Sequence, residues 1–149
     1  MMVLNAQNHV LLCRRVGVPD GWQMPQGGID DGEEPRAAAL RELKEEIGTD
    51  NVEIVAETKG WRHYDLPPEM APKTWEGRYA GQRHKWFLMR FKGQDADIRL
   101  DSAHPEFDSR KWVPPDHVPT MVVSFKQALY QSVLEEFRDH ILWLPRTSR

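Results

Sequence analysis

Two stretches with a helical repeat of apolar residues divide the chain. From Ser124 to about Trp143 apolar side chains recur every four residues, which is typical of one face of a helix. They are Phe125, Leu129, Val133, Phe137 and Ile141. A second helix is predicted from Pro35, since proline is tolerated in a first turn, to Gly48, which suits a left-handed stop. Its apolar stripe is Ala39, Leu40, Leu43 and Ile47.

Short apolar runs on either side of the shorter helix predict strands. Residues 1–5 and 9–15 form a predicted hairpin, and residues 22–25 a short extended piece. Residues 84–91 have an unbroken apolar middle, which is typical of a central strand. Further strands are expected at residues 52–64 with a break near Gly60, at 97–100 weakly, and at 107–113. Residues 66–82 are rich in Pro and Gly and predict an irregular loop.

Strands flanked by two helices imply an α/β fold, in which a sheet carries a helix on each face. At 149 residues the chain is expected to form one domain, residues 1–149. The first predicted strand is short, so few ladder hydrogen bonds and weak pairing are expected for it.

Bulk composition narrows the class of protein. The net charge of −3 does not suggest a general polyanion binder, so any contact with nucleic acid should be local. The single cysteine, Cys13, lies in an apolar run and has no internal disulfide partner. No run approaches the ~20 apolar residues of a membrane span, and no secretory signal opens the chain. We therefore expect a soluble, cytoplasmic protein.

The shorter helix carries an acidic cluster. Glu42, Glu45 and Glu46 fall within an arc of about 100° on its surface. Three such carboxylates repel one another, and a divalent cation with a preference for oxygen ligands would compensate them. An ordinary solvent-exposed acidic face is the alternative interpretation.

Residues on either side of the acidic cluster favour a metal site over an ordinary solvent-exposed face. Gly27, Glu33, the run Arg41-Glu42-Leu43, the pair Glu45-Glu46 and Gly48 stand at spacings that resemble the Nudix hydrolase signature. The resemblance implies an α/β/α sandwich with a mixed sheet and two or three Mg²⁺ or Mn²⁺ ions. It also implies metal ligation by the three glutamates and by the backbone carbonyl of Gly27. Arg41 would orient a glutamate, with Glu33 as its partner, rather than merely form a surface ion pair.

Four further blocks resemble one bacterial subfamily, the RNA pyrophosphohydrolases and dinucleoside polyphosphate hydrolases. They are residues 22–28, 82–88, 105–108 and 122–126. In such proteins a glutamate in the Pro-Glu-Phe context, here Glu106, binds metal or activates water; an exposed loop acid is the alternative. Phe125 would stack on a base, or else pack in the core, and Lys126 would meet phosphate. Arg15, Lys85 and Tyr64 are further candidates for binding substrate.

The resemblance implies cleavage of a pyrophosphate linkage in RNA 5′ ends, in diadenosine tetraphosphate, or in both. The alternatives are a housekeeping diphosphatase acting on ADP-ribose or another nucleotide, and a noncatalytic nucleotide-binding regulator. Similar proteins carry an arginine in the first strand, upstream of the first residue here, that touches RNA. The first strand is therefore expected to be shortened. Without that arginine the affinity for RNA would be lower, whereas the metal chemistry would be unaffected.

Overall fold

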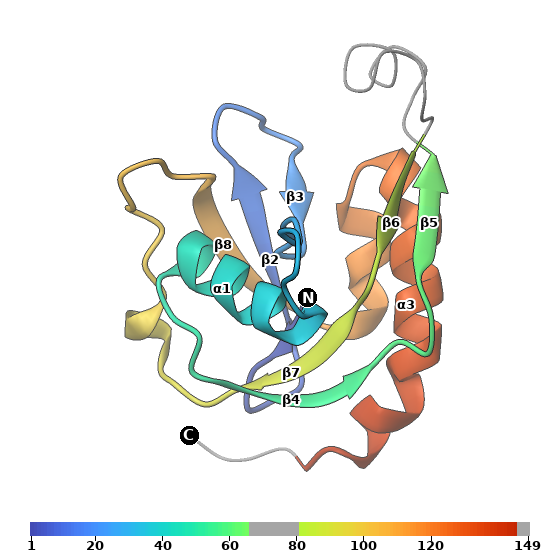
Figure 1. Ribbon diagram of the computed structural model, residues 1–149. Coiled ribbons are helices and arrows are strands. Elements are labelled where there is room, and N and C mark those ends of the chain that lie inside the picture. The colour runs from blue at the N-terminus through green and yellow to red at the C-terminus, as the bar shows by residue number, and fades with distance from the viewer. Residues whose placement is uncertain (66–80, 146–149) are drawn as a thin grey trace.

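The computed structural model of this chain is a mixed β-sheet held between two helices (Figure 1). It describes residues 1–65 and 81–145, with residues 62–65, 81–84 and Phe125 described by their backbone alone. Helix α1 spans Pro35–Ile47 and helix α3 spans Ser124–Trp143, which confirms both predicted helices and the α/β class. No helix in the described residues is long and apolar enough to cross a membrane.

The main sheet joins its strands in the order β3, β2, β1, β7 and β4, and β8 also pairs with β2. These strands are β1 (Met2–Leu4), β2 (Val10–Arg15), β3 (Trp22–Gln23), β4 (Val52–Glu57), β7 (Phe87–Phe91) and β8 (Phe107–Val113). The pairing of β1 with β7 is parallel and the others are antiparallel, so the sheet is mixed. β5 (Arg62–Asp65) and β6 (Gly81–His84) form a separate antiparallel pair.

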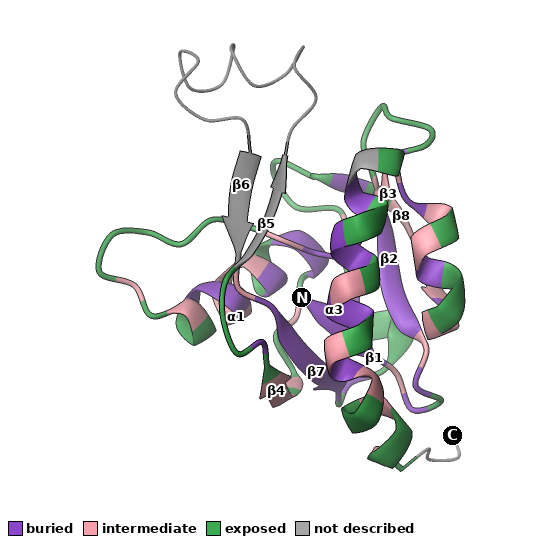
Figure 2. Cartoon of the chain, turned by 90° about the vertical axis from the view of Figure 1, so that its right-hand side faces the viewer, coloured by how far each residue is buried: buried purple, intermediate pink, exposed green. Residues whose placement is uncertain are grey.

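The core lies on both faces of the sheet. Met2 and Leu4 of β1 belong to the cluster under α3, whereas Val3 between them belongs to the cluster under α1. This alternation follows from the two-residue period of a strand. The helices complete the clusters with Leu43 and Ile47 from α1 and with Leu129, Val133 and Phe137 from α3. Figure 2 shows α3 with its buried side toward the strands and its exposed side outward.

Strand β1 is more firmly held than its length suggests. It lies between β2 and β7, and all its residues are fully buried. Met2, Val3 and Leu4 pair in register with residues of β7, while Leu4 also pairs with Val10. The strand is short, as predicted, and burial on two faces stabilises it in addition to its few ladder bonds.

The prediction of a weak strand at residues 97–100 is wrong. The structure describes these residues and shows a 3₁₀ helix at Asp95–Asp97, followed by irregular chain. The side chains of Gln94 and Asp97 each accept the other residue's backbone N–H, which closes a capping box. Local side-chain bonds of this kind compete with strand formation.

The strand expected at residues 84–91 is found as β7 over Phe87–Phe91, while His84 ends a separate strand, β6. Pairing in β6 stops at His84 and resumes in β7 at Phe87. Between them the backbone of Trp86 exchanges hydrogen bonds with Thr58, whose hydroxyl accepts from the Trp86 N–H at 3.1 Å. Of the predicted loop at residues 66–82, residues 66–80 lie outside the described part of the chain and residues 81–82 belong to β6.

Two buried polar side chains tie the C-terminal end of α3 to the sheet. Arg90 on β7 donates to the Asn8 side chain at 2.7 Å and to the Pro145 carbonyl at 3.0 Å. Asn8, in a left-handed turn with φ 63°, donates to the carbonyls of Leu144 and Ile141 at 3.1 and 3.4 Å. These donors bind carbonyls at and just beyond the last turn of the helix.

Nearer its start, α3 is bonded to the chain that leads out of β3. The hydroxyl of Tyr130, which is fully buried, accepts the backbone N–H of Met24 at 3.0 Å. Tyr130→Phe keeps the ring but leaves that buried N–H without this acceptor. We expect the free energy of unfolding to fall by about 1–3 kcal/mol in denaturant titrations. Ser132→Ala is the control, because its hydroxyl bonds the Leu129 carbonyl of the same helix. Equal stability of Tyr130→Phe and wild type would contradict a stabilising role for this bond.

Candidate functional site

The acidic site is built on α1 and on the turn that precedes it. Glu34 stands at the N-cap, and Pro35 lies in the first turn as predicted. Gly48 ends the helix with φ 80°, and its N–H bonds the Lys44 carbonyl. The apolar stripe of α1 packs on the sheet, and Glu42 lies between the helix and the Gly27 turn.

Arg41 binds several oxygens of this turn at once. Its Nε and Nη2 donate to the two carboxylate oxygens of Glu33, each at 2.8 Å. Its Nη1 donates to Glu42 at 2.8 Å, and Nη2 also donates to the Gly28 carbonyl at 3.0 Å. The hydrogen bond from Arg41 is the main cause that lowers the pKa of Glu33 to about 2. The predicted Arg41–Glu33 pair is thus confirmed, and a planar guanidinium suits such bidentate binding.

Glu46 lies in a different environment. It is 5% exposed, and within the described residues neither of its carboxylate oxygens accepts a hydrogen bond of ordinary geometry. Desolvation is the main cause that raises its pKa to about 8, and the carboxylates of Glu106 and Glu42 add to the rise. The Met1 amino group and the Gln26 backbone oppose it. A buried acid without a partner is costly unless it is protonated or meets a cation.

The three glutamates of the arc do not point together. Glu46 is buried, Glu42 is held by Arg41, and the side chain of Glu45 is 60% exposed. Among the described residues no three Asp, Glu, His or Cys side chains gather closely enough to hold one ion. Metal binding by all three glutamates stays a prediction.

Gly27 is in very close approach to Glu42. A methyl group added at Gly27 would overlap the Glu42 carboxylate, whereas one added at Gly28 would meet nothing within 4 Å. The absence of a side chain at Gly27 is therefore what lets the turn lie against this acid. The arrangement agrees with the predicted use of the Gly27 carbonyl beside the carboxylates, although no ligand role follows from it alone.

Glu106 is an exposed residue of the loop before β8. Its backbone carbonyl accepts the Val16 N–H at 3.0 Å, which ties this loop to the end of β2. Its carboxylate is near enough to Glu46 to raise the pKa of that residue. The structure thus brings Glu106 toward the acidic helix across about 60 residues of sequence.

Of the predicted substrate-binding residues, Lys126 and Arg15 come together. Lys126 is 7% exposed and donates from Nζ to the Gln23 side chain at 3.0 Å. Burial is the main cause that lowers the pKa of Lys126 to about 8, and the charge of Arg15 adds to it. Gln23 was not predicted as a site residue, because only the packing of α3 on β3 brings it to Lys126.

The other candidates are placed differently. Lys85 forms an ion pair with Glu57 at 3.6 Å, and Arg36 lies at 3.5 Å from the other oxygen of the same carboxylate. The side chains of Tyr64 and Phe125 lie outside the described part of the structure. Binding of substrate by these three residues stays a prediction.

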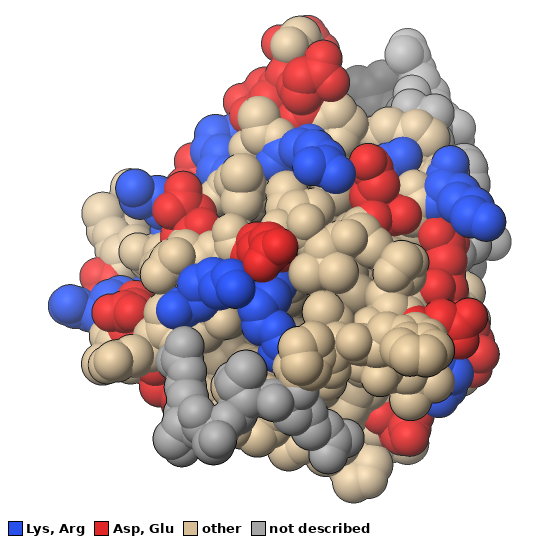
Figure 3. Space-filling model, turned by 90° about the horizontal axis from the view of Figure 1, so that it is seen from below, with Lys and Arg blue, Asp and Glu red and all other residues tan. Residues whose placement is uncertain are grey.

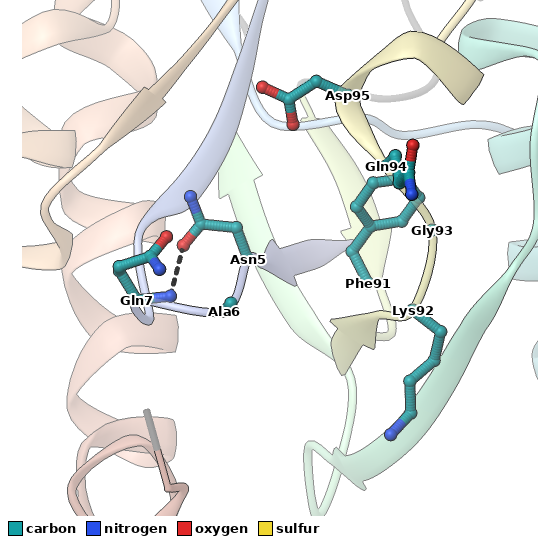
Figure 4. A pocket seen from close by; sticks show the side chains of 8 residues that line it. All are labelled: Asn5, Ala6, Gln7, Phe91, Lys92, Gly93, Gln94 and Asp95. Carbon is teal, nitrogen blue, oxygen red and sulfur yellow. Dashed lines mark hydrogen bonds between the residues drawn. The ribbon is translucent and has the colours of Figure 1, made fainter. Parts of the chain in front are cut away.

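A depression of about 580 Å³ lies at another place, where the β1–β2 turn meets the chain after β7 (Figure 4). Its polar groups already have partners. Asn5 accepts the backbone N–H of Gln7 and of His9, and Asp95 accepts the Trp112 indole N–H at 3.1 Å. The depression therefore lacks converging free groups, and the acidic site remains the candidate.

Comparison with known proteins identifies the family. A model of the NUDIX domain matches residues 1–133. The chain is 52% identical over 136 residues to an RNA pyrophosphohydrolase of Rhodospirillum rubrum, covering 91% of this chain and 82% of that protein. It is 51% identical over 146 residues to an RNA pyrophosphohydrolase of Novosphingobium aromaticivorans, covering 95% and 91%. The chain therefore belongs to the Nudix family and is an enzyme of that family, a pyrophosphohydrolase.

Solved structures confirm the predicted Nudix fold. The Escherichia coli dihydroneopterin triphosphate pyrophosphohydrolase has a TM-score of 0.65 at 22% identity, covering 90% of this chain and 93% of that one. A binary complex of the Caenorhabditis elegans Ap4A hydrolase has a TM-score of 0.63 at 20% identity, covering 93% and 96%. At these identities the likeness shows the fold alone.

Nudix hydrolases generally use divalent metal ions such as Mg²⁺ or Mn²⁺. The residues here fit such ions, because the site offers oxygen ligands, among them a buried carboxyl that accepts no hydrogen bond of ordinary geometry within the described residues. The groups that would supply such ligands are the carboxylates of Glu42, Glu46 and Glu106 and the Gly27 carbonyl. Glu45 lies at the exposed rim of the site.

We predict that Gly27→Ala lowers Mn²⁺ affinity and turnover by at least about tenfold, the scale for disturbing groups that orient metal ligands. The added methyl group would displace a Glu42 carboxylate that Arg41 holds in place. Gly28→Ala is the matched control, and it should stay within about threefold of wild type since its methyl group meets open space. Titration with Mn²⁺ and steady-state kinetics measure both variants. Equal effects of the two substitutions would contradict a special role of the Gly27–Glu42 approach.

The raised pKa of Glu46 predicts a pH dependence of stability. The pKa of Glu46 is about 8 in the fold against an ordinary value of 4.5, so the metal-free folded protein binds one more proton than the unfolded chain between these pH values. Its contribution to stability therefore falls as pH rises through this window, by up to about 1.4 kcal/mol per pH unit. Glu46→Gln removes this contribution. The Tm of the variant minus the Tm of wild type should therefore rise from pH 5 to pH 8.

The difference in Tm between variant and wild type is the quantity to measure, because it removes the slopes that other titrating groups contribute to both curves. Glu45→Gln, at an exposed position, should follow the wild-type curve. Parallel curves for wild type and Glu46→Gln would rule out a raised pKa at Glu46.

Proposed function

We propose that this enzyme hydrolyses a pyrophosphate linkage in nucleoside 5′-polyphosphates and that it uses two or three Mg²⁺ or Mn²⁺ ions. Its substrates are RNA 5′ ends, dinucleoside tetraphosphates, or both. The observation that carries the proposal is the buried, unpartnered carboxyl of Glu46 beside the acids Glu42 and Glu106. Relatives about half identical over most of their length, named RNA pyrophosphohydrolases, support the RNA end as substrate.

Glu42, Glu45, Glu46 and Glu106, with the carbonyl of Gly27, would hold the metal ions. When bound, such ions neutralise phosphate charge and make a water more acidic. In the metal-free protein the Glu46 carboxyl keeps its proton at neutral pH, and it must release that proton to act as a ligand. One of these glutamates would serve as the general base.

Arg41 acts as a positioning residue. Its bonds to Glu33 and to the Gly28 carbonyl fix the guanidinium, which in turn holds one oxygen of Glu42 at 2.8 Å. The Glu42 carboxylate is thereby oriented toward the Gly27 turn. Orientation of this kind reduces the reorganisation that reaction requires.

The basic side of the site would bind the nucleotide. Lys126, held by Gln23, and Arg15 would bind phosphate, and Phe125 at the start of α3 would stack on a base. Lys85 and Tyr64 are proposed as further contacts. We further propose that residues 1–149 act as one domain and that the enzyme works in the cytoplasm.

The decisive experiment compares 5′-triphosphate RNA, diadenosine tetraphosphate and ADP-ribose with Mg²⁺ present. We predict that RNA or the dinucleotide is preferred, and that Glu46→Gln lowers kcat/KM by at least about 100-fold, the scale for removing an essential group. Lys92→Gln, an exposed residue paired with Glu53, is the control. Full activity of Glu46→Gln would remove that residue from the mechanism. A clear preference for ADP-ribose would instead overturn the substrate class.

A further inference from the structure

Gln23 holds a lysine of α3 at the face of the sheet that carries the acidic helix. Gln23 pairs in register with Cys13 on β2, and Cys13 belongs to the core cluster under α1, so the side chains of both residues lie on that face. Within the described residues β3 pairs with no strand other than β2, which leaves its other side open to a side chain from α3. Lys126 starts from α3, which packs on the opposite face, and its Nζ reaches the Gln23 side-chain oxygen at 3.0 Å.

Gln23 is also close to the acidic site. Directly opposite residues of an antiparallel pair have their Cβ atoms about 4.5–5.5 Å apart, so Gln23 and Cys13 are neighbours. The charge of Glu46 is near enough to Cys13 to contribute, after burial, to the raised pKa of its thiol. The chain from Gln23 to Gly27 spans at most about 14 Å. The Lys126 ammonium therefore lies at the border of the acidic site.

Gln23 binds this ammonium without neutralising it. Both side chains are in buried residues, each 7% exposed. An amide oxygen orients an ammonium by a hydrogen bond, whereas a carboxylate in its place would form an ion pair and cancel the charge. Burial and the charge of Arg15 both lower the pKa of Lys126 and so disfavour the ammonium. A phosphate bound at this border would supply negative charge that stabilises it.

Binding of phosphate by this protein depends on individual cations rather than on the charge of a whole surface. The net charge is −3, so a polyanion is not attracted to the protein in general. On the face at the lower end of Figure 1, Figure 3 shows basic and acidic side chains intermixed. A lysine that is already oriented in the free enzyme loses less side-chain entropy when an anion binds to it. Orientation of Lys126 is therefore expected to favour binding of the substrate.

We propose that Gln23 is a positioning residue for substrate binding, a neutral acceptor that fixes the Lys126 ammonium and leaves its charge to the phosphates of the substrate. This proposal rests on phosphate binding by Lys126 as proposed above, and it adds the residue that orients the lysine. Because Gln23 acts on binding rather than on the chemical step, its substitution should change KM and leave kcat nearly unchanged.

The test separates orientation from charge with two substitutions of Gln23. Gln23→Met removes the acceptor and should raise KM for 5′-triphosphate RNA and for diadenosine tetraphosphate about 3- to 10-fold. Gln23→Glu keeps the shape but pairs with the ammonium, so KM should rise at least about tenfold while Tm stays near that of wild type. In both variants kcat should change less than about twofold.

Binding is also measured directly, by calorimetric titration with a non-hydrolysable analogue of diadenosine tetraphosphate. The Kd of the analogue should follow KM in both variants. Lys92→Gln is the matched control, because it makes the same change of net charge as Gln23→Glu at an exposed position paired with Glu53. A folded Gln23→Glu variant with the KM and Kd of wild type would overturn the positioning role.

A further substitution shows whether the effect passes through the lysine. Lys126→Met should raise KM about 10- to 100-fold, the scale for losing a hydrogen bond to a charged group. In that background Gln23→Met should change KM less than about twofold, because the ammonium that it positions is absent. Additive effects of the two substitutions on KM would contradict the proposal.

The outcomes distinguish this proposal from the proposed function. An effect of Lys126→Met on KM without any effect of the Gln23 variants would reject positioning by Gln23 and leave the phosphate contact of Lys126 standing. A wild-type KM in Lys126→Met would reject that contact, and the role of Gln23 with it, while the hydrolase activity stands. Wild type that cleaves neither substrate would instead overturn the proposed function.

Discussion

The placement of one guanidinium decides how charge is distributed over the acidic helix. Arg41 satisfies both oxygens of Glu33 and one of Glu42, and all three bonds are 2.8 Å long. Glu46, on the side of the helix that faces the sheet, receives no such bond. Two acids are thus held in fixed positions by a cation, while a third is buried and accepts no hydrogen bond of ordinary geometry. An ionised carboxylate at this position is stabilised only if a cation binds beside it, which is why the site suits a metal ion.

The rest of the scaffold brings further groups to the acidic helix from distant parts of the chain. The Gly27 turn follows β3 and lies against Glu42, and Glu106 comes from the loop before β8. Hydrogen bonds between β3 and α3 span more than a hundred residues of sequence, as in Lys126–Gln23 and Met24–Tyr130. The sheet makes these approaches possible, because a mixed sheet lets β1 lie between β2 and β7 with its faces covered by both helices.

Periodicity predicted much of this fold. Strand β8 and helix α3 begin and end at the predicted residues, and the caps of α1 are those that Pro35 and Gly48 indicate. The Arg41–Glu33 pair was predictable too, since both residues belong to one local segment. The errors have nonlocal or competing causes: Thr58 binds Trp86 where one strand was expected, and a capping box replaces a weak strand near Asp97. The contact of Gln23 with Lys126 and the burial of Glu46 depend on tertiary packing, which spacing alone does not reveal.

Helix α3 is anchored near both ends, by Arg90 and Asn8 at its last turn and by Gln23 and the Met24 N–H near its first turns. Its 20 residues make a rod about 30 Å long. Because both ends are held, neither the first turn nor the last can shift without breaking a hydrogen bond. The turn between β1 and β2 and the chain after β3 therefore fix one rigid element between them, and with it the position of the Lys126 ammonium.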